Sequence, residues 1–212
     1  MSGDEIEDRT RGYFQATYDA HGATSKGLDY NGRPAHYTRL GVLAAEVDRR
    51  TGFSVADVGC GYGSLLDALY GAGKRDFAYR GYDLVEGLVE RGRAEWGTPD
   101  GRIAFVHGGT DRLERADYVL ASGVFNIKQE TPAKVWRDYV LACLEEMSAA
   151  AGRKTAATFL TAYSDEDRKR DDLYYPDPAD LFAFAMKLTG QAAIRHDYGL
   201  YDFTLVIGAG RG

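Results

Sequence analysis

A glycine-rich turn and an aspartate downstream of it are the residues of this chain best suited to binding a nucleotide. The turn reads Asp57-Val-Gly59-Cys-Gly61-Tyr-Gly63, and Asp83 follows its last glycine by twenty residues. Glycine has no Cβ and adopts positive φ readily, so the backbone of such a turn can approach a ligand closely. A carboxylate at this offset accepts hydrogen bonds from ribose hydroxyls. We therefore expect a nucleotide-containing cofactor.

The spacing of the glycines bears on which nucleotide is bound. A dinucleotide fingerprint has the form G-x-G-x-x-G, and its last glycine would fall at position 64, which is Ser64. The pattern therefore disfavours NAD(P), although an oxidoreductase of that kind stays open as an alternative at this point.

The turn needs a strand before it and a helix after it. Residues 53–59 are predicted to form a buried strand, and the apolar positions after Ser64 predict a helix that ends near Gly71. A second strand over 77–83 ends at Asp83, and a helix over 85–96 follows it. Two successive strand-helix units favour a parallel sheet with right-handed crossovers, in which ligands bind beyond the carboxyl ends of the strands.

The rest of the chain supplies further elements of the same kind. Strands are predicted over 103–107, 117–122, 155–160, 192–198 and 202–207, and helices over 7–18, 35–52, 132–150 and 178–188. Residues 108–116 are too few for a helical crossover, so we expect only a turn there. The short link 199–201 predicts an antiparallel hairpin at the end of the chain. The glycine-rich segment 21–34 is expected to be a lid-like loop.

Composition limits the kinds of protein and partner. A chain of 212 residues with 44% apolar residues fits one domain, and a net charge of −6 argues against a nucleic-acid partner. No apolar run reaches the roughly 20 residues that cross a membrane, and the start of the chain does not resemble a signal peptide, so we expect a cytoplasmic protein. Cys60 and Cys143 are expected to be reduced, and no spacing suggests a metal site. The oligomeric state stays open.

The glycine turn and Asp83 resemble motif I and the ribose-binding acidic residue of the class I, S-adenosylmethionine-dependent methyltransferases. The segments 122–128 and 196–203 also resemble a bacterial, small-molecule-type branch of that family. The resemblance implies a doubly wound, Rossmann-like α/β sheet of seven strands in the order 3-2-1-4-5-7-6, with strand 7 antiparallel. It implies a single methyltransferase domain over 1–212, in which 1–50 form a helical cover with the loop and 53–208 form the core.

The same resemblance implies a set of cofactor-binding residues, with S-adenosylmethionine as the cofactor and S-adenosylhomocysteine as the product. They are Asp57, Gly59, Cys60, Gly61, Gly63, Asp83, Leu84, Asp111, Ser122 and Gly123. Asp111 stands in the segment after the third strand, where family members carry an acidic residue that meets the adenine. Residues 121–126 occupy the position that lines the reaction centre.

The acceptor side is less clearly marked. Aromatic and amide side chains on the cover and after strands 4 and 5 are the candidates for substrate binding, namely Tyr13, Tyr18, Tyr37, Asn126, Tyr163 and Tyr175. If the acceptor must lose a proton, a histidine is the typical base. His196 ends a strand on the ligand side, and His21 and His36 flank the glycine-rich loop, so these three are the catalytic candidates.

We therefore expect an enzyme that transfers a methyl group from S-adenosylmethionine to a small-molecule acceptor by in-line displacement, with O- or N-methylation favoured. Two alternatives stay open beside it: an NAD(P)-binding oxidoreductase on the same kind of sheet, and a non-catalytic protein that binds S-adenosylmethionine.

Overall fold

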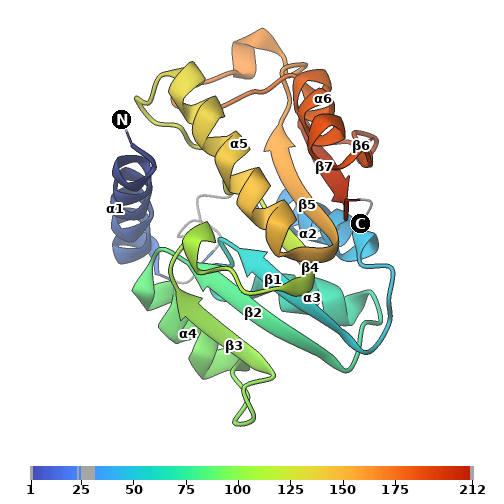
Figure 1. Cartoon of the computed structure of the whole chain (residues 1–212). Helices are drawn as coiled ribbons and strands as arrows, with labels where there is room; N and C mark the ends of the chain where they lie inside the picture. The colour runs from blue at the N-terminus through green and yellow to red at the C-terminus, as the bar shows by residue number, and fades with distance from the viewer. Residues whose placement is uncertain (1, 23, 25–31, 211–212) are drawn as a thin grey trace.

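The protein is one α/β sandwich built on a central seven-stranded sheet, as a computed structural model shows (Figure 1). The structure describes residues 2–22, 24 and 32–210. The strands are β1 (Phe53–Val58), β2 (Phe77–Asp83), β3 (Ile103–His107), β4 (Ala116–Ala121), β5 (Ala151–Leu160), β6 (Ala192–Arg195) and β7 (Asp202–Gly208). Their order in the sheet is β3-β2-β1-β4-β5-β7-β6. Strands β1 to β5 are parallel to one another, and β7 is antiparallel to both β5 and β6. The predicted fold class is confirmed.

The described residues also form six α-helices and two 3-10 turns. They are α1 (Gly3–His21), α2 (Arg33–Glu46), α3 (Ser64–Gly71), α4 (Glu86–Trp96), α5 (Ala133–Ala150), α6 (Pro178–Thr189), η1 (Thr110–Arg112) and η2 (Glu166–Arg168). Within the described chain, none of these helices is long and apolar enough to cross a membrane.

The helices cover both faces of the sheet. On one face, α5 and α6 bury Trp136, Leu144 and Leu181 against alternate strand residues such as Val119 and Phe203. On the other face, the buried side chains of α2, α3 and α4 form a separate core with the remaining strand residues. The alternation of strand side chains thus divides the interior into two layers, as expected for a sheet buried on both sides.

The first helix is longer than the predicted 7–18. The side chain of Ser2 accepts a hydrogen bond from the backbone N–H of Glu5, and the Glu5 carboxylate accepts one from the N–H of Ser2. This capping box moves the start of the helix to Gly3. Ile6 is buried in the α5 face of the core, so the helix is fixed to the sheet domain.

Several other predicted boundaries differ from the structure. The second helix ends at Glu46 and not near Gly52, because Val47 is extended and fully buried. Strand β5 begins at Ala151, directly after α5, whereas β6 ends at Arg195, so the hairpin link is longer than three residues. The connection from β3 to β4 is a turn, as predicted, with η1 as its only regular element. Most of the segment 21–34 that was expected to be a lid, namely 23 and 25–31, lies outside the described residues.

Candidate active site

The glycine turn joins β1 to α3 with left-handed backbone at each of its glycines. The φ angles of Gly59, Gly61 and Gly63 are 65°, 55° and 97°. The N–H groups of Gly59 and Cys60 both donate to the carbonyl of Tyr82 on β2, at 2.8 and 3.0 Å. A side chain at position 59 would meet Val124 at 2.6 Å. Glycine is therefore required here both for conformation and for space.

Gly63 has a packing role in addition. A Cβ there would lie 2.9 Å from the ring of Phe105 and 3.1 Å from that of Trp96. Its place is between α3 and the β3 side of the core, and it does not line the cavity described below.

Asp83 is held rigidly beside the turn. One carboxylate oxygen accepts a hydrogen bond from the N–H of Gly61 at 2.8 Å, and the other accepts one from the N–H of Val85 at 2.9 Å. The side chain is buried, and burial raises the pKa of its carboxyl, whereas these backbone donors lower it. The two bonds fix both oxygens in position before any ligand binds.

A second buried carboxyl, Asp57, lies at the end of β1. It accepts a hydrogen bond from the hydroxyl of Tyr79 at 2.7 Å. Burial raises its pKa from 3.8 to about 7, the hydroxyl of Tyr79 opposes the shift, and the charge of Asp83 adds to it. Two aspartates thus make this end of the sheet acidic and ready for a cationic group.

A large cavity opens over the carboxyl ends of β1, β2, β4 and β5. Its lining includes eight of the ten predicted cofactor residues, which are Asp57, Gly59, Cys60, Gly61, Asp83, Leu84, Ser122 and Gly123. The predicted residues Gly63 and Asp111 are not part of the lining; the Asp111 side chain is 64% exposed and pairs with Arg112. The neighbours of Asp111 in the loop after β3 line the cavity instead; they are Gly108, Gly109 and Thr110.

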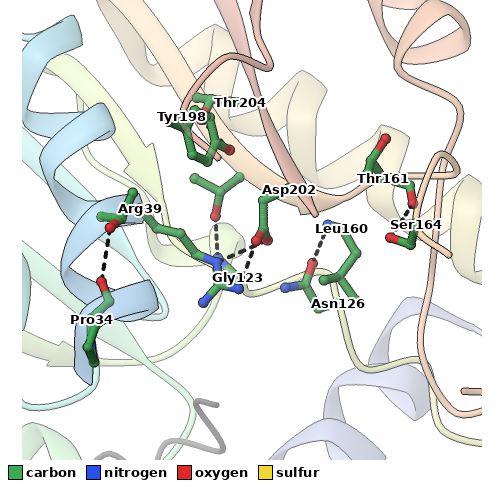
Figure 2. Close-up of polar contacts among 12 residues, drawn as sticks. Pro34, Arg39, Gly123, Asn126, Leu160, Thr161, Ser164, Tyr198, Asp202 and Thr204 are labelled. Atoms are coloured by element: carbon green, nitrogen blue, oxygen red, sulfur yellow. Dashed lines mark hydrogen bonds and ion pairs between the residues drawn. The ribbon is translucent and has the colours of Figure 1, made fainter. Parts of the chain in front are cut away.

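Of the predicted substrate residues, only Asn126 lines the cavity. Its side-chain oxygen accepts a hydrogen bond from the N–H of Leu160 at 3.1 Å, which fixes the amide between the ends of β4 and β5 (Figure 2).

The predicted tyrosines have other contacts. Tyr18 packs against Gly87 and donates to its carbonyl, at 3.3 Å, and Tyr37 donates to Asp67. Tyr13 packs edge-on against Phe14, and Tyr163 is 67% exposed. The hydroxyl of Tyr175 accepts a hydrogen bond from the N–H of Arg170. The structure does not bring these tyrosines to the cavity.

The three candidate histidines separate in the same way. His36 lines the cavity, and burial, together with the charge of Arg39, lowers its pKa to about 4. His21 is exposed at the end of α1. His196 is exposed beyond β6, next to the rings of Tyr163 and Phe203. Of these three histidines, only His36 lines the cavity, and its lowered pKa keeps the imidazole neutral at neutral pH.

Helix α1 also lines the cavity, through side chains that were not among the predicted site residues. Glu7, Thr10 and Phe14 line the cavity, and the hydroxyl of Tyr139 donates to Glu7 at 3.5 Å. Burial and the charge of Asp111 raise the pKa of the Glu7 carboxyl. The spacing of positions 7, 10 and 14 places them on one side of a helix, and this pattern in the sequence could have indicated that they line the cavity together.

Helix α2 contributes a buried ion pair to the opposite end of the cavity. Arg39 lines the cavity, and its Nε and Nη2 donate to the two carboxylate oxygens of Asp202, at 2.9 and 2.8 Å (Figure 2). The side chains of Arg39 and Asp202 are 9% and 2% exposed. The pair joins α2 to the first residue of β7, a link that no local pattern in the sequence reveals.

Comparisons with known proteins identify the family to which this chain belongs. No protein-family model matches the chain. A Mycobacterium tuberculosis protein named as a methyltransferase (Rv1506c) is 39% identical over 158 residues, an alignment that covers 73% of this chain and 92% of that protein.

Two solved structures with S-adenosylhomocysteine bound share the fold. One is the magnesium protoporphyrin IX methyltransferase of Synechocystis PCC 6803, with a TM-score of 0.71, 17% identity, and coverage of 96% of this chain and 100% of that one. The other is DhpI, with a TM-score of 0.67, 14% identity, and coverage of 98% of both chains.

The sequence identity extends over nearly the whole of the M. tuberculosis protein, and the strand order with its reversed seventh strand is that of the structural relatives. This relationship decides between the nucleotide cofactors that the glycine spacing left open. The chain is an enzyme of the class I, S-adenosylmethionine-dependent methyltransferase family.

Proposed function

We propose that this enzyme binds S-adenosylmethionine over β1 and β2 and transfers its methyl group to a small-molecule acceptor held over β4 and β5. The observation that carries the proposal is the placement of Asp83, a buried carboxylate fixed by two backbone donors beside the glycine turn and facing a large cavity.

Asp83 has the acceptor capacity that a ribose requires. An ionised carboxylate offers about four lone-pair sites. Two are used by the N–H groups of Gly61 and Val85, one on each oxygen. One site on each oxygen remains, so two ribose hydroxyls can be bound without loss of the bonds that hold the side chain.

The rest of the cofactor is proposed to follow the cavity on either side of Asp83. The adenine lies against Leu84 and the backbone of Gly108–Thr110, next to Asp111. The methionine end lies along Cys60 and Gly61, with Ser122 and Gly123 of the β4 end beside it. An ammonium group beside Asp57 would favour the ionised form of its carboxyl and lower the pKa that burial raises to about 7.

Methyl transfer at this site depends mainly on alignment. When bound, the cofactor supplies a methyl group already activated by a sulfonium. Residues 122–126 would hold the acceptor nucleophile in line with the carbon–sulfur bond that breaks as the new bond forms. Helices α1 and α2 exclude water from the cavity through Phe14 and Leu40.

The next question is which group removes a proton from the acceptor. A hydroxyl or ammonium acceptor must release a proton, and a base with a pKa near neutral does this best. His36 is in its basic form at neutral pH, but a pKa of about 4 makes it a weak base. We propose that O- or N-methylation is driven by positioning, with the proton passing to water.

Isothermal titration tests the cofactor assignment. We expect S-adenosylhomocysteine and S-adenosylmethionine to bind and NAD(H) not to bind; binding of NAD(H) alone would overturn the proposal. Gly61→Val should abolish binding, because it places a branched side chain at the cavity wall. Gly73→Val is the matched control, since Gly73 also has positive φ, 76°, but a Cβ there meets no atom within 4 Å. If the control loses affinity as well, backbone strain and not occlusion is responsible.

A transfer assay separates an enzyme from a protein that only binds the cofactor. The labelled methyl group of S-adenosylmethionine is followed into a small-metabolite extract, with the wild type and with Gly61→Val. Label that accumulates with the wild type alone supports the enzyme, whereas tight cofactor binding without transfer to any fraction favours the non-catalytic alternative.

The domain organisation belongs to the same proposal. Residues 1–212 are proposed to form one methyltransferase domain in which the first 50 residues cover the core of 53–208. Ile6 of α1 and Leu43 of α2 lie in the two cores of the sheet domain, which supports a cover that is part of the folded unit.

A further inference from the structure

The charged residues that line the cavity are divided between its two ends. Three carboxyl groups, Glu7, Asp57 and Asp83, lie around the ends of β1 and β2 and under α1. The end over β4 and β5 is lined by Arg39 and Arg170, and by no carboxyl group among the described residues. The cofactor end is thus suited to a cationic ligand, and the acceptor end is suited to an anionic one.

Arg39 is arranged as an anion-binding group would be. A guanidinium carries five N–H donors, of which Asp202 accepts two, one from Nε and one from Nη2. Asp202 is not part of the cavity lining, so it holds the guanidinium from behind. Figure 2 shows the third guanidinium nitrogen directed away from Asp202. Three N–H groups remain on a side chain that is 9% exposed, and no described residue accepts from them.

Two further donors lie along the same end of the cavity. The oxygen of the Asn126 side chain is occupied by the N–H of Leu160, which leaves the amide NH₂ as a donor. Arg170 lies at the rim, where its side chain is paired with Asp172 and is half exposed. The acceptor end therefore presents hydrogen-bond donors from α2 and from the β4 end, with the guanidinium of Arg170 at its rim.

We propose that the acceptor of this enzyme carries an acidic oxyanion group, a carboxylate or a phosphate, which is bound by the Nη1 edge of Arg39. The inference rests on the proposed function, because it names the class of acceptor for the same cavity. Planar guanidinium groups bind both oxyanions through paired N–H donors, and a carboxylate behind the group fixes the orientation of that edge.

The side-chain resonances of Arg39 test the proposal without knowledge of the natural acceptor. Protein saturated with S-adenosylhomocysteine is titrated at constant ionic strength with acetate, with methyl phosphate, and with acetamide as the neutral match to acetate. The Nε–Hε signal of Arg39, assigned by its absence in Arg39→Lys, should shift saturably with acetate or methyl phosphate and not with acetamide. The anion with the lower Kd distinguishes a carboxylate acceptor from a phosphate acceptor.

Arg195 provides the matched control in the same spectra. It is also held by a carboxylate, with its Nε 2.8 Å from Glu46, but it lies outside the cavity on β6. Its signal should show no saturable shift. An Arg39 signal that responds to neither anion, or only as the Arg195 signal does, overturns the proposal.

A double variant tests the role in catalysis while preserving the fold. Removing Arg39 alone would leave Asp202 buried without its partner, which is strongly destabilising. Arg39→Gln combined with Asp202→Asn removes both charges and keeps a hydrogen-bonded pair. The variant should bind S-adenosylhomocysteine like the wild type, and the KM for the acceptor should rise about 10- to 100-fold, as expected for a lost charge-assisted hydrogen bond. An unchanged acceptor KM contradicts the proposal.

Fractionation identifies the class of the natural acceptor. The metabolite extract is passed over an anion exchanger before the methyl-transfer reaction, and acceptor activity should be found in the retained fraction. Activity confined to the unretained fraction overturns the inference but leaves the methyltransferase assignment intact. If S-adenosylhomocysteine itself fails to bind the wild type, the proposed function fails instead, so the two failures are distinguishable.

Discussion

Replacement of Asp83 by asparagine is the most direct perturbation of the cofactor site. The carboxylate accepts from two backbone donors, Gly61 and Val85, through its two oxygens. An asparagine has one oxygen and one NH₂ group, so in either orientation one buried N–H faces another donor. An unsatisfied buried donor costs about 1–3 kcal/mol. The melting temperature should therefore fall by roughly 2–10 °C for a domain of this length.

The same substitution should weaken cofactor binding further. A ribose hydroxyl loses a charged acceptor, and a hydrogen bond to a charged group contributes about 1.5–3 kcal/mol. That range corresponds to a decrease in affinity of about 10- to 150-fold. Isothermal titration with S-adenosylhomocysteine measures the affinity, and thermal unfolding without ligand measures the stability.

Asp138→Asn is the control for this prediction. Asp138 lies on α5 with its side chain 54% exposed and paired with Lys134, so its replacement should change stability by no more than about 0.5 kcal/mol. Wild-type affinity for S-adenosylhomocysteine in Asp83→Asn would refute the ribose assignment. A normal melting temperature would refute the account of the buried hydrogen bonds.

Three further perturbations address the parts around Asp83. Burial raises the pKa of Asp57 from 3.8 to about 7; because the folded pKa is the higher one, stability from this group is full below about pH 4 and is lost toward pH 7. Asp57→Asn should remove that decline, on the order of 4 kcal/mol at most, and urea unfolding across this range measures the slope; an unchanged slope would assign the decline to other groups. Gly59→Ala should destabilise the protein, since its Cβ would meet Val124 at 2.6 Å. Adding Val124→Ala should recover the steric part of the cost and leave the strain of the left-handed backbone, about 1–2 kcal/mol; no recovery would show that the contact is not the cause. Gly87→Ala would usually stabilise a helix, but its Cβ would lie 2.6 Å from the ring of Tyr18. Hydrogen exchange in α1 should therefore accelerate, and unaltered protection would show that Tyr18 does not hold the helix down.

Much of the cofactor half was predictable from sequence because its signals are local. The glycines, the strand before them and Asp83 lie within one strand-helix-strand stretch, and each has its own backbone or spacing requirement. The order of the sheet followed from the family resemblance together with the short last connection. The boundaries that differ, such as the start of α1 at Gly3, were set by a cap of two polar side chains outside the apolar pattern.

The walls of the cavity were predicted less well because residue type is a weaker guide than helix face. On α2, His36, Arg39 and Leu40 share the face that lines the cavity, and Tyr37 is turned away toward Asp67. Positions one residue apart on a helix differ in direction by about 100°. The tyrosines named from the sequence on α1 and α2 therefore lie on helices that line the cavity, but they are not part of its lining.

The partner of Arg39 could not be inferred from the sequence at all. Arg39 and Asp202 are 163 residues apart, and their contact exists only after α2 and β7 have docked on the same sheet. Asp202 lies in the segment 196–203 that resembles the family, but nothing in that resemblance names Arg39 as its partner.

Under the proposal that Arg39 binds the acceptor, this long-range ion pair makes the acceptor site depend on two distant parts of the chain, α2 and the start of β7. The glycine turn and Asp83 lie within the continuous stretch from β1 to the end of β2, whereas the guanidinium of Arg39 is oriented by the first residue of β7. During synthesis, the carboxylate that orients Arg39 is therefore added long after the glycine turn and Asp83.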